Sequence, residues 1–178
     1  PADVFAVGGG QAADLLDRLD PRRMFTHGAA TQSPPVVFLL PGGGTQYPGM
    51  AAGLYDAEPL FRHHVDDGLR RAEHDHGLSL RPLLLPAPNT GPEALAEAAT
   101  SFEHASVQLP ALLIVEHALA RLLMSWGVEP AALLGHSVGE NVAACLAGTM
   151  SFADCLGLVV LRGRLMDRTR GAMMAVPM

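Results

Sequence analysis

The stretch LLGHSVGENVAA, residues Leu133 to Ala144, decides the expected fold. An apolar run leads to Ser137, which stands between two glycines at G-x-S-x-G spacing, and helix-forming residues follow. This order predicts a short buried strand at 131–134, a sharp turn at the serine, and a helix at 138–147 that Gly148 ends. A serine on such a bend is typical of a nucleophile, because the helix directs free N–H groups toward a developing oxyanion. The alternative is a serine that caps an ordinary turn.

Strands and helices alternate on both sides of this stretch. Val36–Leu40 is a five-residue apolar run that suits a buried parallel strand, and the loop PGGGTQ follows it. The alternation predicts the α/β class. The expected helices span 56–76, 109–126 and 151–167, the second with Pro110 in its first turn and the third with an S-x-x-D cap formed by Ser151 and Asp154.

The first residues read as a separate segment. Val4–Val7 predicts a strand, and three glycines and a helical pattern follow it. Gly8, Gly10 and Ala13 have the GxGxxA spacing of a dinucleotide site, but the second strand and the acidic residue of such a site are missing, which favours a tight turn. Residues 29–35, AATQSPP, predict a linker.

Composition narrows the possible functions. The 178 residues are 49% hydrophobic and can bury a core, while a formal net charge of −6 without charge runs favours neither nucleic acid nor a membrane surface as partner. All basic residues are arginines, which excludes a P-loop lysine, a Schiff-base lysine and a Ser-Lys dyad. Cys145 and Cys155 lack a metal-type spacing and are interpreted as reduced core residues. No apolar run is expected to approach the length needed to span a bilayer, so a soluble cytoplasmic protein is expected.

Two further features bear on chemistry. The loop at 40–46 can supply a second backbone N–H opposite that of Val138, although a glycine-rich loop without a ligand is the alternative. Arg162 lies on the apolar side of its expected helix, where an unpaired charge is costly. Its anionic partner is either a core carboxylate or a substrate carboxylate, and spacing alone leaves both open. The segment RHHVDDGLRRAEHDH, 62–76, mixes His and Asp with Arg and favours an exposed helix over a metal site.

The motifs PGGGTQYPGM, GHSVGE and RGRLM resemble the acyltransferase domain of modular polyketide synthases and the malonyl-CoA:acyl carrier protein transacylases. The resemblance implies an α/β-hydrolase-like large subdomain with a parallel sheet, cut before or within a ferredoxin-like small subdomain. It implies that 1–33 is the end of a ketosynthase–acyltransferase linker and that 34–178 is the first part of the acyltransferase domain.

The same resemblance implies the roles of the site residues. Ser137 would be the acylated nucleophile, the N–H groups of Gly43 and Val138 the oxyanion hole, Arg162 the carboxylate-binding residue, and His136 a lining residue that is not the base. The reaction would move a malonyl-type unit from coenzyme A to the phosphopantetheine thiol of an acyl carrier protein, next to a ketosynthase domain. No bound cofactor or metal is implied. A branched residue after the serine, here Val138, accompanies malonyl over methylmalonyl selectivity.

Three departures from the family pattern stand out. Gly43 occupies a position that is usually glutamine, and Leu109 aligns with another glutamine, with Gln108 one place early. The family's histidine base lies about a hundred residues after the serine, whereas the last histidine of this chain is His136, so the chain alone is expected to be inactive. The remaining alternatives are an α/β-hydrolase-like esterase or thioesterase, which needs a downstream acid and histidine, and a non-catalytic scaffold.

Overall fold

The computed structural model describes residues 2–3, 27–28 and 34–169, and the chain divides into two units, Pro1–Pro35 and Val36–Met178. In the first unit, strand β1 (Ala2–Asp3) pairs antiparallel with β2 (His27–Gly28). The strand expected at 4–7, the glycines after it and the helix that follows lie outside the described residues. The expected boundary between 33 and 34 stays a prediction.

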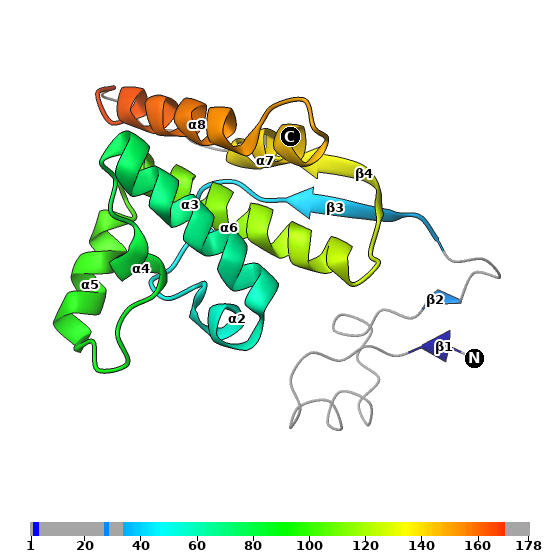
Figure 1. The fold of residues 1–178 in the computed structure, drawn as a ribbon, viewed down its shortest axis with the longest axis horizontal. Helices are drawn as coiled ribbons and strands as arrows, with labels where there is room; N and C mark the ends of the chain where they lie inside the picture. The colour runs from blue at the N-terminus through cyan, green and yellow to red at the C-terminus, as the bar shows by residue number, and fades with distance from the viewer. Residues whose placement is uncertain (1, 4–26, 29–33, 170–178) are drawn as a thin grey trace. The chain divides into compact units, whose positions relative to one another are not determined.

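The second unit is an α/β structure in which strands β3 (Val36–Leu40) and β4 (Pro130–Gly135) lie side by side, although several helices separate them along the chain (Figure 1). Strand β3 pairs parallel with β4, with Leu40 opposite Gly135. This parallel pair confirms the α/β class. In chain order the elements are β3 (Val36–Leu40), α2 (Ala52–Ala57), α3 (Pro59–His76), α4 (Arg81–Leu84), α5 (Pro92–Ser101), α6 (Ala105–Ser125), β4 (Pro130–Gly135), α7 (Val138–Leu146) and α8 (Phe152–Met166).

The two strands are less buried than the sequence predicts. In β3 only Phe38 and Leu40 are buried, and no residue of β4 is fully buried. Since side chains alternate along a strand, one face of the pair meets the core while the other carries Leu39, 70% exposed. On β4, Leu134 is 63% exposed. An uncovered apolar face is unusual for a parallel sheet, whose two faces are normally both covered.

Helix α6 is the centre of the core and packs against α3, α7 and α8 (Figure 1). By length and composition this 21-residue helix could cross a membrane, so the expectation that no segment reaches that length was wrong. Its buried side chains, however, belong to the same hydrophobic core as those of the neighbouring helices. The core residues of α6 are Leu109, Pro110, Ala111, Leu112, Leu113, Ile114, Ala118, Ala120 and Leu122.

Two helix boundaries differ from the prediction. The helix expected at 56–76 is two helices, because Glu58 is extended (φ −116°, ψ 105°) before Pro59, and proline disfavours a helical residue in front of it. Helix α6 starts at Ala105, four residues early, which places Pro110 inside the helix. The carboxylate of Asp167 accepts hydrogen bonds from the N–H groups of Ala105 (2.8 Å) and Ser106 (3.2 Å). A cap from a residue so distant in the chain leaves no local signal.

The cap of α8 is confirmed. Ser151 is its N-cap residue, and the side-chain oxygen accepts a hydrogen bond from the N–H of Asp154 at 3.1 Å. The Ser151 hydroxyl donates to the Asp154 carboxylate at 2.6 Å. This cap fixes the start of the helix that carries Arg162.

Candidate active site

Ser137 lies on the turn between β4 and α7, as the sequence predicts. Its φ of 56° and ψ of −115° make it the one non-glycine residue with positive φ in the described part of the chain. Such a backbone conformation costs roughly 1–3 kcal/mol and is found mainly at functional sites.

The glycines around Ser137 are required by space. A Cβ atom on Gly135 would lie 2.2 Å from the backbone nitrogen of Glu140, and one on Gly139 would lie 2.1 Å from the carbonyl oxygen of Leu40. Neither glycine has positive φ. The G-x-S-x-G spacing therefore reflects how closely helix α7 approaches the ends of both strands.

The glycine-rich loop after β3 reaches the serine. The His136 N–H donates a hydrogen bond to the carbonyl of Leu40 at 2.9 Å, which extends the strand pairing up to the turn. A Cβ atom on Gly42 would lie 2.8 Å from Nδ1 of His136 and 3.0 Å from Cβ of Ser137. The loop thus packs directly on the two residues that the sequence singled out.

Arg162 extends from α8 to the same turn. Its Nη2 donates to Oγ of Ser137 at 3.1 Å, and its Nη1 donates to Oδ1 of Asn141 at 3.1 Å. The guanidinium is half-buried, and both partners are neutral oxygens. No acidic side chain pairs with Arg162 among the described residues. The sequence left two possible partners for Arg162 open. The first of them, a core carboxylate, does not pair with Arg162 within the described residues.

Asn141 is a site residue that the sequence did not single out. It lies four positions after Ser137, at the spacing that brings two residues to the same side of a helix. That spacing was the only signal in the sequence. Its side chain holds one arm of the Arg162 fork while the other arm meets the serine hydroxyl.

Two backbone N–H groups, one at the serine turn and one in the glycine-rich loop, have no hydrogen-bond acceptor in the described part of the structure. They belong to Val138, the first residue of α7, and to Gly43 in the loop. A helix N-terminus carries partial positive charge, and an unpaired N–H can donate a hydrogen bond to an anion. The arrangement is chemically suited to stabilising negative charge on an oxygen next to Oγ.

No histidine among the described residues hydrogen-bonds to the Ser137 hydroxyl. Only Arg162 hydrogen-bonds to Oγ of Ser137 in the described structure. On α3 and α6, His63, His64 and His117 form edge contacts, with ring centroids 5.4 and 5.6 Å apart. Burial, followed by the charges of His117 and Arg121, lowers the pKa of His64 to about 4.

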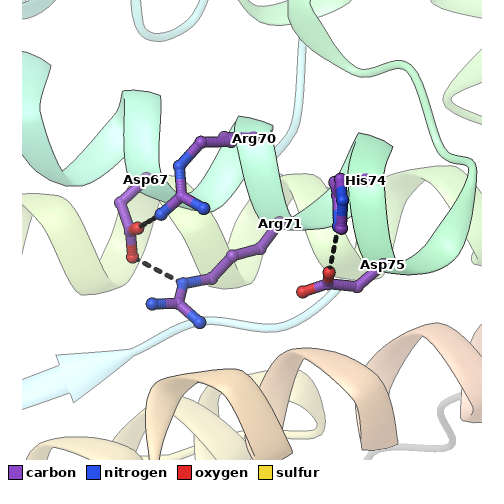
Figure 2. A network of polar contacts seen from close by, with 5 residues as sticks. All are labelled: Asp67, Arg70, Arg71, His74 and Asp75. Atoms are coloured by element: carbon purple, nitrogen blue, oxygen red, sulfur yellow. Dashed lines mark hydrogen bonds and ion pairs between the residues drawn. The ribbon is translucent and has the colours of Figure 1, made fainter.

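The polar segment 62–76 forms ion pairs along α3 (Figure 2). The carboxylate of Asp67 pairs with both Arg70 and Arg71, the latter at 2.7 Å, and His74 lies 2.7 Å from Asp75. No group of three possible metal ligands occurs among the described residues. These two aspartates of the helix are thus engaged by neighbouring basic side chains.

The chain matches the acyl transferase domain family over residues 37–177. It is 41% identical over 149 residues to a component of the phenolphthiocerol/phthiocerol polyketide synthase of Mycobacterium tuberculosis, a match that covers 83% of this chain and 9% of that protein. It is also 41% identical over 151 residues to the mycoketide-CoA synthase of the same species, with 84% and 3% coverage.

Solved structures show the same likeness. The acyl transferase domain of ZmaA superimposes with a TM-score of 0.72 at 33% identity, covering 91% of this chain and 36% of that chain. The structure of MCAT from Streptococcus pneumoniae gives 0.61 at 31% identity, covering 74% and 38%. The expected acyltransferase fold is thereby confirmed. The chain spans less than a tenth of these curated relatives and little more than a third of the solved domains.

Proposed function

Because this chain belongs to the acyl transferase domain family, we propose that it holds the nucleophile of an enzyme that transfers a malonyl-type unit from coenzyme A to a carrier-protein thiol. The observation that carries this proposal is the 3.1 Å contact between Nη2 of Arg162 and Oγ of Ser137. In a malonyl thioester one methylene separates the reacting carbonyl from the carboxylate. A group that binds the carboxylate must therefore lie beside the nucleophile, as Arg162 does.

The proposed reaction has two acyl transfers at Ser137. In the first, Oγ loses its proton and bonds to the thioester carbon, the carbon–sulfur bond breaks, and the coenzyme A thiol leaves with a proton. In the second, the phosphopantetheine thiol of an acyl carrier protein attacks the ester. The carbon–oxygen bond then breaks, and Oγ recovers its proton. No resident cofactor is needed for either step.

Gly43 and Val138 are the proposed oxyanion hole. In both transfers the carbonyl oxygen becomes an oxyanion, and two N–H donors fixed beside Oγ lower the energy of that state. Removal of one such donor typically costs about 10²–10³ in rate. His136 is the proposed lining residue, because its ring packs on the loop that carries the first donor.

Arg162 is the proposed carboxylate-binding residue. Only two of its N–H groups are used by contacts within the described structure, and an arginine has five. Asn141 holds one arm of the planar fork, and the donors without a partner in the described structure are available for a carboxylate. A half-buried cation without an acidic partner in the described residues also favours acyl transfer over the esterase alternative, because a neutral ester offers it no counter-charge.

The base is proposed to lie outside these 178 residues. A serine hydroxyl is a weak nucleophile at neutral pH, and general base catalysis typically contributes about 10²–10⁴ in rate. The chain alone is therefore proposed to be inactive. The proposed surroundings are a cytoplasmic polyketide synthase in which a ketosynthase domain and a carrier protein are the partners, without nucleic acid or membrane.

Arg162→Ala tests the proposal in a polypeptide that joins this chain to the rest of an acyltransferase domain. Malonyl transfer should fall about 10- to 100-fold more than acetyl transfer, because a charge-assisted bond of about 1.5–3 kcal/mol is lost and acetyl has no carboxylate. Arg162→Lys is the matched control and should recover part of the malonyl rate. Equal losses for malonyl and acetyl would show that Arg162 only supports the fold.

A further inference from the structure

Gly43 is a glycine for a reason other than backbone conformation. Its φ is not positive, in contrast to that of Gly44 at 111°. A Cβ atom on Gly43 would nevertheless lie 2.3 Å from Oε1 of Gln108, far inside contact distance. The space where a side chain of residue 43 would begin is therefore occupied by a side chain from the first turn of α6.

The side-chain amide of Gln108 is also held by a hydrogen bond. Its Nε2 donates a hydrogen bond to the carbonyl of Phe102, the C-cap residue of α5, at 3.3 Å. Phe102 is only 3% exposed, so this carbonyl belongs to a firmly packed residue. With the nitrogen end fixed there, the oxygen end of the amide is directed at Gly43.

A second glutamine also links the loop to the carbonyl of Phe102. Gln46, in the loop itself, accepts a hydrogen bond from the Gly44 N–H at 2.8 Å and donates to the carbonyl of Phe102 at 3.4 Å. The two amides therefore converge on one carbonyl and meet the loop at adjacent residues. These two side chains and α5 line a hollow of about 470 Å³ beside the loop.

We propose that Gln108 is a positioning residue for the oxyanion hole, and that residues 43 and 108 form a coupled pair in which only one can carry a side chain of full size. Gln108 fills the space above Gly43 and keeps its N–H beside Ser137. This inference rests on the proposed role of Gly43. A displacement of about 1 Å at such a donor is enough to cost about 100-fold in rate.

A double-mutant cycle tests the coupling in a polypeptide that joins this chain to the rest of an acyltransferase domain. Gly43→Ala should lower kcat for Ser137 acylation about 10-fold with little change in KM, because the methyl group displaces the mobile end of the Gln108 amide and a misplaced donor acts on the transition state. Gln108→Ala should lower kcat about 10-fold, because the loop loses one of its two amide supports. In the Gln108→Ala background, Gly43→Ala should cost less than about 3-fold, because the clash has gone.

Gly53→Ala is the matched control and should leave the rate unchanged, because nothing lies within 4 Å of a Cβ atom there. Its effect on stability is that of a glycine-to-alanine exchange within a helix, a gain of up to about 1 kcal/mol. Equal costs of Gly43→Ala in both backgrounds would overturn the inference. The apparent melting temperature is measured for all four proteins of the cycle, and a merely structural role would lower it in parallel with kcat. If the parent protein acylates no serine, the proposed function fails. If the melting temperatures of the cycle are non-additive but Gly43→Ala lowers kcat equally in both backgrounds, only the positioning role of Gln108 is overturned.

Discussion

Ser137 is both the proposed nucleophile of this chain and a residue with a strained backbone. A serine at positive φ has no stabilising reason to be there, and a Cβ atom on either flanking glycine would collide with neighbouring backbone atoms. The sequence predicted this turn because the G-x-S-x-G spacing reports the steric requirement directly. It could not predict Asn141 as a partner of Arg162, because that contact depends on how α8 packs against α7.

Gly139→Ala tests the steric basis of the turn. The added methyl group would lie 2.1 Å from the carbonyl oxygen of Leu40, which is backbone and has little freedom to move. We expect a loss of about 1–3 kcal/mol in the free energy of unfolding, typical of overpacking in a rigid core. Denaturant unfolding measures it, with Gly53→Ala as the control for the glycine-to-alanine change itself. A loss below about 0.5 kcal/mol would mean that α7 can move away from β3.

Donor choice is the prediction attached to Val138. In the family that the chain resembles, a branched residue after the serine accompanies malonyl over methylmalonyl selectivity, and the Val138 side chain is fully buried at the start of α7. In direct competition the joined polypeptide should acylate Ser137 with malonyl first. Preference for methylmalonyl-CoA would contradict this prediction and would place the selecting contacts elsewhere in the domain.

At the scale of elements, the helix interiors were predictable and several ends were not. Apolar spacing located α6 and α8 because each buries a continuous face. The start of α6 was missed since its cap, Asp167, lies at the far end of α8. Desolvation raises the pKa of Asp167, but hydrogen bonds from Ser106 and Ala105 outweigh it and leave the pKa lowered.

Glu116 makes α6 sensitive to pH. The residue is 9% exposed, neither carboxylate oxygen has a hydrogen-bond partner within the described structure, and burial raises its pKa to about 8. Between the ordinary glutamate pKa of 4.5 and about 8, the folded chain keeps a proton that the unfolded chain releases. The free energy of unfolding should therefore fall as pH rises through this window, by at most about 1.4 kcal/mol per pH unit.

Glu116→Gln should remove that slope and leave the rest of the pH profile unchanged. Chemical unfolding at about pH 5, 6, 7 and 8, run side by side on the parent and the variant, measures the difference. Identical slopes in the two proteins would show that Glu116 gains a partner that this part of the structure does not contain.

At the scale of the whole molecule, the sequence predicted the fold class and the family but not the burial of the sheet. Apolar strand residues were expected to be covered on both faces, yet Leu39 and Leu134 are exposed. The pattern of a strand shows which residues suit burial, whereas actual burial depends on elements that pack against it. This chain spans only 36% and 38% of two solved acyltransferase domains, so such elements can come from the remainder of the domain.

Identification of the acylated residue tests the role of Ser137 most directly. The joined polypeptide is incubated briefly with malonyl-CoA and digested, and the peptides are mapped by mass spectrometry, with Ser137→Ala in parallel. We expect one malonylated peptide, with the acyl group on Ser137, and no acylated peptide from the variant. Malonyl on another serine, or label that persists in Ser137→Ala, would contradict the assignment of Ser137 as the nucleophile.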